Sequence, residues 1–195
     1  MDGDLPSYDV RPLDASTWPD FAALAERHRG VWGGCWCLGF HAEGSLRGDE
    51  IDRRATKEAL VREGRAHAAL VYDGDTCVGW CQFGSVEELP NMKHRKRYEA
   101  GLTALPDWKI TCFFVASDAR RRGVSSVALG GALDQIARLG GGVVESYPED
   151  AAGRKTSAGF LHNATASVFE RQGFTRTRQI GKHHWVVTRT VEPAT

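Results

Sequence analysis

The segment RRRGVSS, residues 120–126, combines three arginines, one glycine and two serines where a helical pattern begins. The first turn of a helix exposes unpaired backbone N–H groups and the positive end of the helix dipole. Gly123 has no side chain, so a ligand can approach the backbone closely there, and Ser125 and Ser126 add hydroxyl donors. This combination favours a site for phosphate or pyrophosphate. A plain helix start with solvated arginines is the other interpretation that the isolated pattern allows.

The segment GGCWCLGFH, residues 33–41, contains residue types that bind zinc. Cys35, Cys37 and His41 stand close together, and Cys77 or Cys81 could complete a set of four ligands. The Cys-x-Cys spacing is tighter than the usual zinc pair, and no second pair follows at the spacing of a zinc ribbon. Small buried cysteines are common in strands such as the one predicted around Cys77 and Cys81. We therefore expect no metal, and a structural zinc site remains the weaker interpretation.

Hydrophobic periodicity predicts the elements that must position these residues. The expected strands are 8–13, a hairpin over 67–84 that turns at 73–75, 108–117, 142–148 and two closing strands over 174–191. The expected helices are 15–29, 48–64, one that follows the basic turn, and 163–172. In the third of these, Leu129, Leu133 and Ile136 fall on one apolar stripe. Residues 85–107 are expected to be a long polar connection.

Composition limits the classes of protein that the chain can represent. It has 195 residues, 42% of them hydrophobic and 26% charged, with a formal net charge of zero. These values are typical of a globular domain, and we expect a single α/β domain over residues 1–195. Neither nucleic acid nor a membrane is indicated by the charge, and no apolar run approaches a membrane span. The beginning of the chain lacks the features of a signal peptide, which predicts a cytoplasmic protein with reduced cysteines.

Two stretches resemble motifs of the GNAT acyltransferase superfamily. The first is FFVASDARRRGVSS, in which Arg120 to Ser125 fit the coenzyme A pattern Arg/Gln-x-x-Gly-x-Gly/Ala, with serine in place of the last small residue. The second is NATASVFERQGF, residues 163–174, which is similar to the last helix of the family. There Asn163 matches a residue that contacts pantetheine, and a helix N-cap is its other interpretation. Phe169 stands where many relatives have the tyrosine that protonates the departing thiolate.

The resemblance implies a GNAT-like mixed, mostly antiparallel sheet of six to seven strands, flanked by about four helices. It also implies acetyl-CoA as a cosubstrate, with its pyrophosphate on the basic turn and its pantetheine arm along the strand before that turn. Backbone N–H groups near Phe114 and Val115 would stabilise the oxyanion. The implied cofactor-binding residues are Phe113, Phe114, Val115, Arg120, Arg121, Arg122, Gly123, Val124, Ser125, Ser126, Asn163 and Phe169.

Acetyl transfer to an amine also needs a proton acceptor for the amine and a proton donor for the thiolate. Glu145 and Tyr147 alternate in VVESYP and so share one face of a strand, where they could take these two roles. The structural alternative is a Glu145 paired with an arginine and a Tyr147 at the edge of the core.

The acceptor would lie beside the segment between the first two helices, as it often does in GNAT-like folds. Trp36 and Phe40 would suit an apolar or planar acceptor, although plain packing explains them equally well. Glu87, just after the predicted hairpin, is a further candidate for contact with the substrate.

We therefore predict an acetyl-CoA-dependent N-acetyltransferase that acts on a small-molecule or peptide amine by direct attack on the thioester. A non-catalytic sensor of acyl-CoA on the same fold is the alternative, because Phe169 cannot donate a proton. No nucleic-acid partner is expected, and the charged run 93–99 fits a solvated surface. The sequence leaves a homodimer open.

Overall fold

The computed structural model of the chain describes residues 7–45, 51–151 and 163–195. Its centre is a seven-stranded sheet in the order β1-β2-β3-β4-β5-β7-β6. The strands are β1 (Tyr8–Pro12), β2 (His67–Asp73), β3 (Thr76–Ser85), β4 (Trp108–Val115), β5 (Gly142–Ser146), β6 (Thr175–Gln179) and β7 (Trp185–Val191). All neighbouring strands are antiparallel except β4 and β5, which are parallel. The expected mixed, mostly antiparallel sheet is confirmed.

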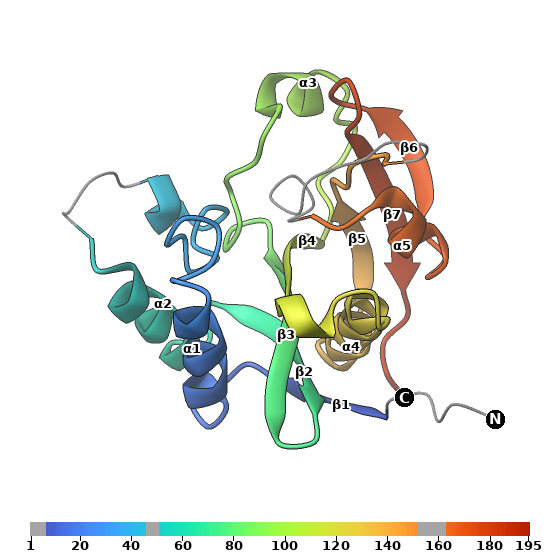
Figure 1. The fold of residues 1–195 in the computed structure, drawn as a ribbon. Helices are drawn as coiled ribbons and strands as arrows, with labels where there is room; N and C mark the ends of the chain where they lie inside the picture. Colours follow the sequence, from blue (N-terminus) through green and yellow to red (C-terminus); the bar gives the residue numbers. More distant parts are fainter. Residues whose placement is uncertain (1–6, 46–50, 152–162) are drawn as a thin grey trace.

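Helices pack on both faces of the sheet (Figure 1). They are α1 (Trp18–Arg27), α2 (Arg53–Arg62), α3 (Arg95–Ala100), α4 (Val124–Arg138) and α5 (Ala166–Glu170). The ring of Phe21 in α1 lies 4.5 Å from that of Trp80 in β3, between centroids. The preceding residue, Gly79, instead faces Val124 at the start of α4. Because successive strand residues point to opposite faces, α1 and α4 cover opposite sides of β3.

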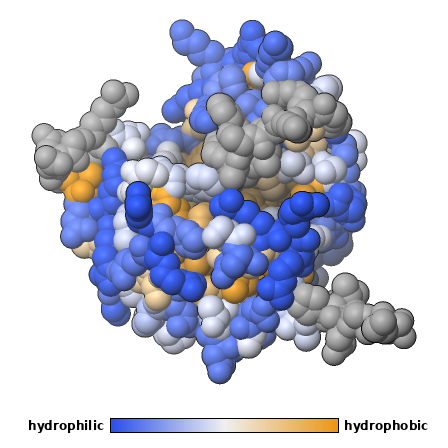
Figure 2. All heavy atoms as spheres, viewed as in Figure 1, coloured by the Kyte–Doolittle hydropathy of each residue, from blue (hydrophilic) through white to orange (hydrophobic). Residues whose placement is uncertain are grey.

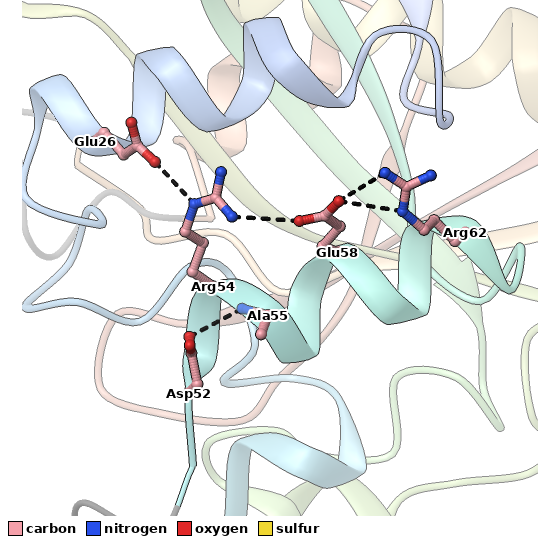
Figure 3. Close-up of polar contacts among 6 residues, drawn as sticks. All are labelled: Glu26, Asp52, Arg54, Ala55, Glu58 and Arg62. Atoms are coloured by element: carbon pink, nitrogen blue, oxygen red, sulfur yellow. Dashed lines mark hydrogen bonds and ion pairs between the residues drawn. The ribbon is translucent and has the colours of Figure 1, made fainter.

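One ion pair joins the first two helices on their exposed sides (Figure 3). Asp52 caps α2 by accepting a hydrogen bond from the backbone N–H three residues later, at 3.0 Å. Arg54 Nε lies 2.8 Å from Glu26 Oε1 of α1, and Arg54 Nη1 lies 3.3 Å from Glu58 Oε2. Exposed pairs of this kind add little stability individually. The Arg54–Glu26 pair nevertheless connects the two helices on either side of the segment that joins them.

Strands β4 and β5 diverge after a short paired region. Their parallel ladder joins Trp108–Ile110 to Val144–Ser146. Among the described residues, no strand pairs with residues 111–115 on the edge of β4 that faces β5. Apart from the Val115 carbonyl, which accepts a hydrogen bond from Arg120, the backbone groups on that edge have no strand partner in the described part of the chain and are placed to pair with an extended ligand.

The helical predictions differ from the structure mainly in two places. The connection 85–107 contains α3, which the sequence did not indicate because it has six residues and only Tyr98 is buried, too few for a periodic signal. The predicted helix 163–172 is shorter, since α5 begins at Ala166 with Thr165 as its N-cap residue. The N-cap interpretation of Asn163 is therefore wrong.

Within the described ranges, none of the helices is long and apolar enough to cross a bilayer.

Candidate functional site

The turn between β4 and α4 borders a cavity of about 170 Å³. Gly123 is the N-cap of α4 with φ 82°, a left-handed conformation that glycine adopts without steric cost. A Cβ atom added to Gly123 would meet no atom within 4 Å, so the backbone here faces open space. The cavity is lined by Val115, Ala119, Arg120, Arg121, Gly123, Val124, Ser125, Ser126, Val168 and Arg171. Most of the predicted residues from the basic turn thus surround a hollow at a helix N-terminus, where an anion is stabilised.

The three arginines of this turn have different surroundings. Arg120 Nε donates a hydrogen bond to the carbonyl oxygen of Val115 at 3.3 Å. Arg122 Nη2 pairs with Asp73 Oδ2 at 3.0 Å, and Arg122 does not line the cavity. Arg121 is exposed, lines the cavity and has φ 63°. Of the three arginines, Arg120 and Arg121 therefore supply the positive charge at the cavity.

Arg171 is a cationic residue of the cavity wall that sequence reasoning missed. It follows α5 directly, at the C-cap position. The signal was available, because Arg171 lies within the segment 163–174 that resembles the last helix of the GNAT family. The motif shows that Arg171 follows the last helix. Its position beside the turn 120–126 depends on the packing of α5 against α4, which the local sequence does not show.

The aromatic side chains at the end of β4 pack on opposite faces of the sheet. Phe113 and Phe114 are buried, whereas Val115 is partly exposed and reaches the cavity. The Phe114 ring packs edge-on against Trp32, with centroids 5.9 Å apart. The Phe113 ring packs on the opposite side against Phe169, at 5.8 Å. Phe169 is fully buried and supports the strand from behind, while its neighbour Val168 lines the cavity.

Asn163 contacts the chain directly after β5. It is buried, and its Nδ2 donates to the carbonyl oxygen of Tyr147 at 3.2 Å. Its Oδ1 is buried and has no hydrogen-bond partner among the described residues. A buried acceptor without a partner is costly, so Oδ1 is suited to a ligand that brings an N–H group.

Glu145 and Tyr147 share a buried hydrogen-bond cluster with Tyr98 of α3. Tyr98 donates to Glu145 Oε2 at 2.8 Å, and Tyr147 donates to the same oxygen at 3.4 Å. Burial raises the pKa of Glu145 above its ordinary value. Burial also raises the pKa of Tyr98 to about 12 and that of Tyr147 further still. The direct partners of Glu145 are thus tyrosines rather than the arginine that the structural alternative supposed.

A larger cavity of about 430 Å³ lies on the α1 side of β4. It is lined by Trp32, Cys35, Cys37, Gly39, Phe40, Asn91, Met92, Lys93 and Cys112. Phe40 contributes to this wall, which is compatible with the predicted contact to an acceptor. In the view of Figure 2, apolar surface lies between the α1 and α4 regions and is bordered by hydrophilic residues.

The other two predicted substrate residues lie elsewhere. Trp36 is part of the core, with its ring 6.2 Å from that of Trp18, and does not line the cavity. Glu87 borders a neighbouring cavity of about 280 Å³, which also contains Tyr98 and Lys109. Met92 lines both cavities.

The segment between α1 and α2 is held in an unusual backbone conformation. Five of its non-glycine residues have positive φ: Arg29, Val31, Trp32, Trp36 and Cys37. Such conformations are strained and persist only where the surrounding structure fixes them. Burial of Val31, Cys37 and Leu38 supplies that constraint, so the cavity wall is preformed.

Within the parts of the chain that the structure describes, no three His, Cys, Asp or Glu side chains form a group that could hold a metal ion.

Solved structures of other proteins share the fold of this chain. No family model matches the sequence. No curated protein matches it. An acetyltransferase structure from Corynebacterium glutamicum superposes with a TM-score of 0.54 at 16% identity, covering 97% of this chain and 98% of that one. A putative acetyltransferase of the GNAT family from Desulfovibrio desulfuricans gives 0.50 at 13% identity, covering 95% and 99%.

The chain has the GNAT fold. A further neighbour is a putative acetyltransferase from Salmonella typhimurium, whose structure includes its cofactor acetyl-CoA. It has a TM-score of 0.53 at 16% identity and covers 95% of this chain and 94% of its own. The fold expectation drawn from the motif resemblance is confirmed. At these identities the likeness describes the fold alone.

Proposed function

We propose that this chain is an acetyl-CoA-dependent N-acetyltransferase. The observation that carries the proposal is the position of the Gly123 cavity beside the unpaired edge of β4. The turn 123–126 would hold the pyrophosphate, and Arg120, Arg121 and Arg171 would neutralise its charge. Residues 113–115 would pair with the pantetheine arm as a strand does, and Asn163 Oδ1 would accept one of its amide N–H groups.

In this proposal the thioester of acetyl-CoA supplies an acetyl group to an amine. Backbone N–H groups near Phe114 and Val115 stabilise the negative charge that develops on the carbonyl oxygen. Glu145 is buried and does not line the acceptor cavity, so it would accept the proton that the attacking amine loses through a bridging water. Tyr147 donates its proton to the thiolate as the C–S bond breaks, and it regains a proton from Glu145, to which it is hydrogen-bonded. The protons balance, because one leaves the amine and one reaches the thiol.

The cavity of about 430 Å³ is the proposed acceptor site. Trp32, Phe40 and Met92 give it an apolar wall that suits an apolar or planar portion of a small molecule or peptide. An acceptor that extends past Met92 would reach Glu87, whose carboxylate suits a second cationic group. Trp36 would contribute indirectly, by supporting the wall from within the core.

A sensor that binds acyl-CoA without turnover is the second candidate, and Phe169 is the observation that favours it. Its ring is fully buried and offers no proton. Steady-state release of the coenzyme A thiol, measured with a panel of amines, peptides and aminoglycosides, distinguishes the two functions. An N-acetyltransferase releases thiol in response to an amine. A sensor binds acetyl-CoA in calorimetry but shows no amine-dependent release.

The arginines of the turn should contribute unequally to acetyl-CoA binding. Arg121→Ala should weaken binding by roughly fivefold and flatten its dependence on ionic strength, because an exposed charge is screened by salt. Arg122→Ala is the matched control, and we expect a smaller effect because Arg122 pairs with Asp73 outside the cavity wall. Calorimetric titrations at several salt concentrations measure both. Equal effects of the two substitutions would contradict the assignment of Arg121 to the phosphate site.

The proposed role of Glu145 predicts a pH dependence of kcat. Glu145 must be ionised to accept a proton, so activity should fall as the pH drops through its folded-state pKa. Because burial raises that pKa, the acid limb should lie above the ordinary value of about 4.3 for a glutamate. Glu145→Gln should lower kcat by roughly 10²-fold and remove the limb. The control Asp134→Asn, an exposed charge change on α4, should leave the profile unchanged. A pH profile that survives Glu145→Gln would exclude Glu145 as the base.

A further inference from the structure

Two cysteines far apart in the sequence meet at the wall of the larger cavity. Cys37 lies in the segment between α1 and α2, and Cys112 lies in β4, 75 residues later. Their sulfur atoms are 2.8 Å apart, and both are free thiols. The side chains are buried, but both border the cavity of about 430 Å³, through which a small reagent can reach them. The proposed acetyl transfer uses neither sulfur.

The surroundings of the pair favour one thiolate and one thiol. Burial opposes the ionisation of Cys37, but a hydrogen bond with Cys112 and the charge of Lys57 outweigh it and lower the pKa of Cys37. Trp80 Nε1 also donates a hydrogen bond to Cys37 Sγ at 3.3 Å. The hydrogen bond to Cys37 and burial raise the pKa of Cys112. A thiolate is the reactive form of cysteine, so Cys37 is the nucleophile of the pair.

Lys57 is held at this position by polar contacts within the core. Its side chain is buried, with Nζ 2.6 Å from Gln82 Oε1 and 3.2 Å from His41 Nε2. Burial lowers the pKa of Lys57, and the negative charge of the Cys37 thiolate offsets only part of this effect. Burial also lowers the pKa of His41 to about 2, so His41 is neutral and can accept a hydrogen bond from Lys57. A buried ammonium group is costly without an anion, and Cys37 can supply one.

We propose that Cys37 and Cys112 form an oxidation site, at which hydrogen peroxide produces a reversible disulfide. The Cys37 sulfur attacks one peroxide oxygen, the O–O bond breaks, and the released hydroxide takes a proton to become water. The resulting sulfenic acid on Cys37 is attacked by the Cys112 sulfur, which breaks the S–O bond and releases a second water. Two thiols lose two electrons in total, and peroxide is reduced to two water molecules.

The geometry requires little movement for this reaction. A disulfide bond is about 2.05 Å long, so the two sulfur atoms must approach by less than about 1 Å. The product would tie the α1–α2 segment to β4 across the cavity wall. Cys35 provides a comparison within the same cavity, because burial raises its pKa and its Sγ accepts the backbone N–H of Gly39 at 3.3 Å.

The test is thiol counting and peptide mapping of the full chain after treatment with hydrogen peroxide at near-stoichiometric concentration. The parent should lose two of its five thiols, yield a cross-linked peptide pair containing Cys37 and Cys112, and recover both thiols with dithiothreitol. Cys35→Ser should give the same cross-link. Cys37→Ser and Cys112→Ser should each give no cross-link. None of these measurements requires acetyl-CoA, so the result is independent of the proposed acetyl transfer.

Three outcomes would overturn the proposal: no loss of thiols, a cross-link that includes Cys35, or sulfinic acid on Cys37 without a cross-link. If Cys112→Ser fails to fold, as judged by near-ultraviolet circular dichroism, the peptide map of the parent still decides the question. Tryptophan fluorescence gives a second readout, because Trp80 contacts the Cys37 sulfur. Its intensity should change on oxidation and return on reduction in the parent, and it should not change in Cys37→Ser.

Discussion

Gly123→Glu should reduce the affinity for acetyl-CoA by at least about 100-fold, which corresponds to about 2.7 kcal/mol. The new side chain would extend from the helix N-terminus into the space that the proposed pyrophosphate occupies, since nothing else lies within 4 Å of a Cβ atom there. It would place a negative charge beside another anion and cover the N–H groups that should bind it. Calorimetric titration with acetyl-CoA measures the loss.

The same substitution at Gly64 is a matched control. Gly64 has φ 69°, is exposed, and a Cβ atom added to it would also meet no atom within 4 Å. Gly64→Glu therefore carries a similar backbone strain and the same charge at a position far along the sequence from the cavity. It should bind acetyl-CoA like the parent. A folded Gly123→Glu variant with parental affinity would rule out this turn as the phosphate site.

Tyr147→Phe should lower kcat by roughly 10²–10⁴-fold, the usual contribution of a general acid. The substitution removes only the hydroxyl that contacts Glu145 Oε2, so the affinity for acetyl-CoA should barely change. The phenol of Tyr147 is protonated at neutral pH, and because burial raises its pKa, it donates a proton to the thiolate only as Glu145 returns one. Pre-steady-state measurement of thiol release tests whether the chemical step itself is slowed.

Tyr98→Phe distinguishes proton donation from a general disturbance of Glu145. Tyr98 bonds to the same carboxylate oxygen at 2.8 Å, a shorter contact than that of Tyr147. Its removal should therefore perturb Glu145 at least as much, yet we expect kcat to fall by less than about tenfold, because Tyr98 donates no proton to the thiolate. Parental chemistry in Tyr147→Phe would make solvent the better proton donor.

Strong periodic signals explain which parts of the fold the sequence predicts. Two elements can be predicted from the sequence alone. Strand β4 is marked by a continuous apolar run, and α4 is marked by the helical spacing of Leu129, Leu133 and Ile136. The basic turn between them is local as well, so the cavity at this turn could be predicted in outline. Helix α3 gave no such signal, because its single buried residue, Tyr98, packs on Tyr147 from a distant part of the chain.

The acceptor side of the candidate site could be predicted less well because it depends on the direction of side chains in an irregular segment. Trp36 and Phe40 are both aromatic and only four residues apart, but Trp36 turns into the core and Phe40 reaches the cavity. The positive φ of Trp36 and Cys37 sets these directions, and no periodic pattern encodes it. The contact between Cys37 and Cys112 likewise arises only when the α1–α2 segment packs on β4.

The most direct test of acetyl transfer is the stoichiometry of a single reaction containing the protein, acetyl-CoA and an amine that stimulates thiol release. Mass spectrometry of the amine and spectrophotometric assay of the thiol follow the two products together. We expect one acetylated amine for each coenzyme A released, and loss of both products in Gly123→Glu. Thiol release without acetylated amine, or equal yields of both products in parent and Gly123→Glu, would contradict acetyl transfer at this site.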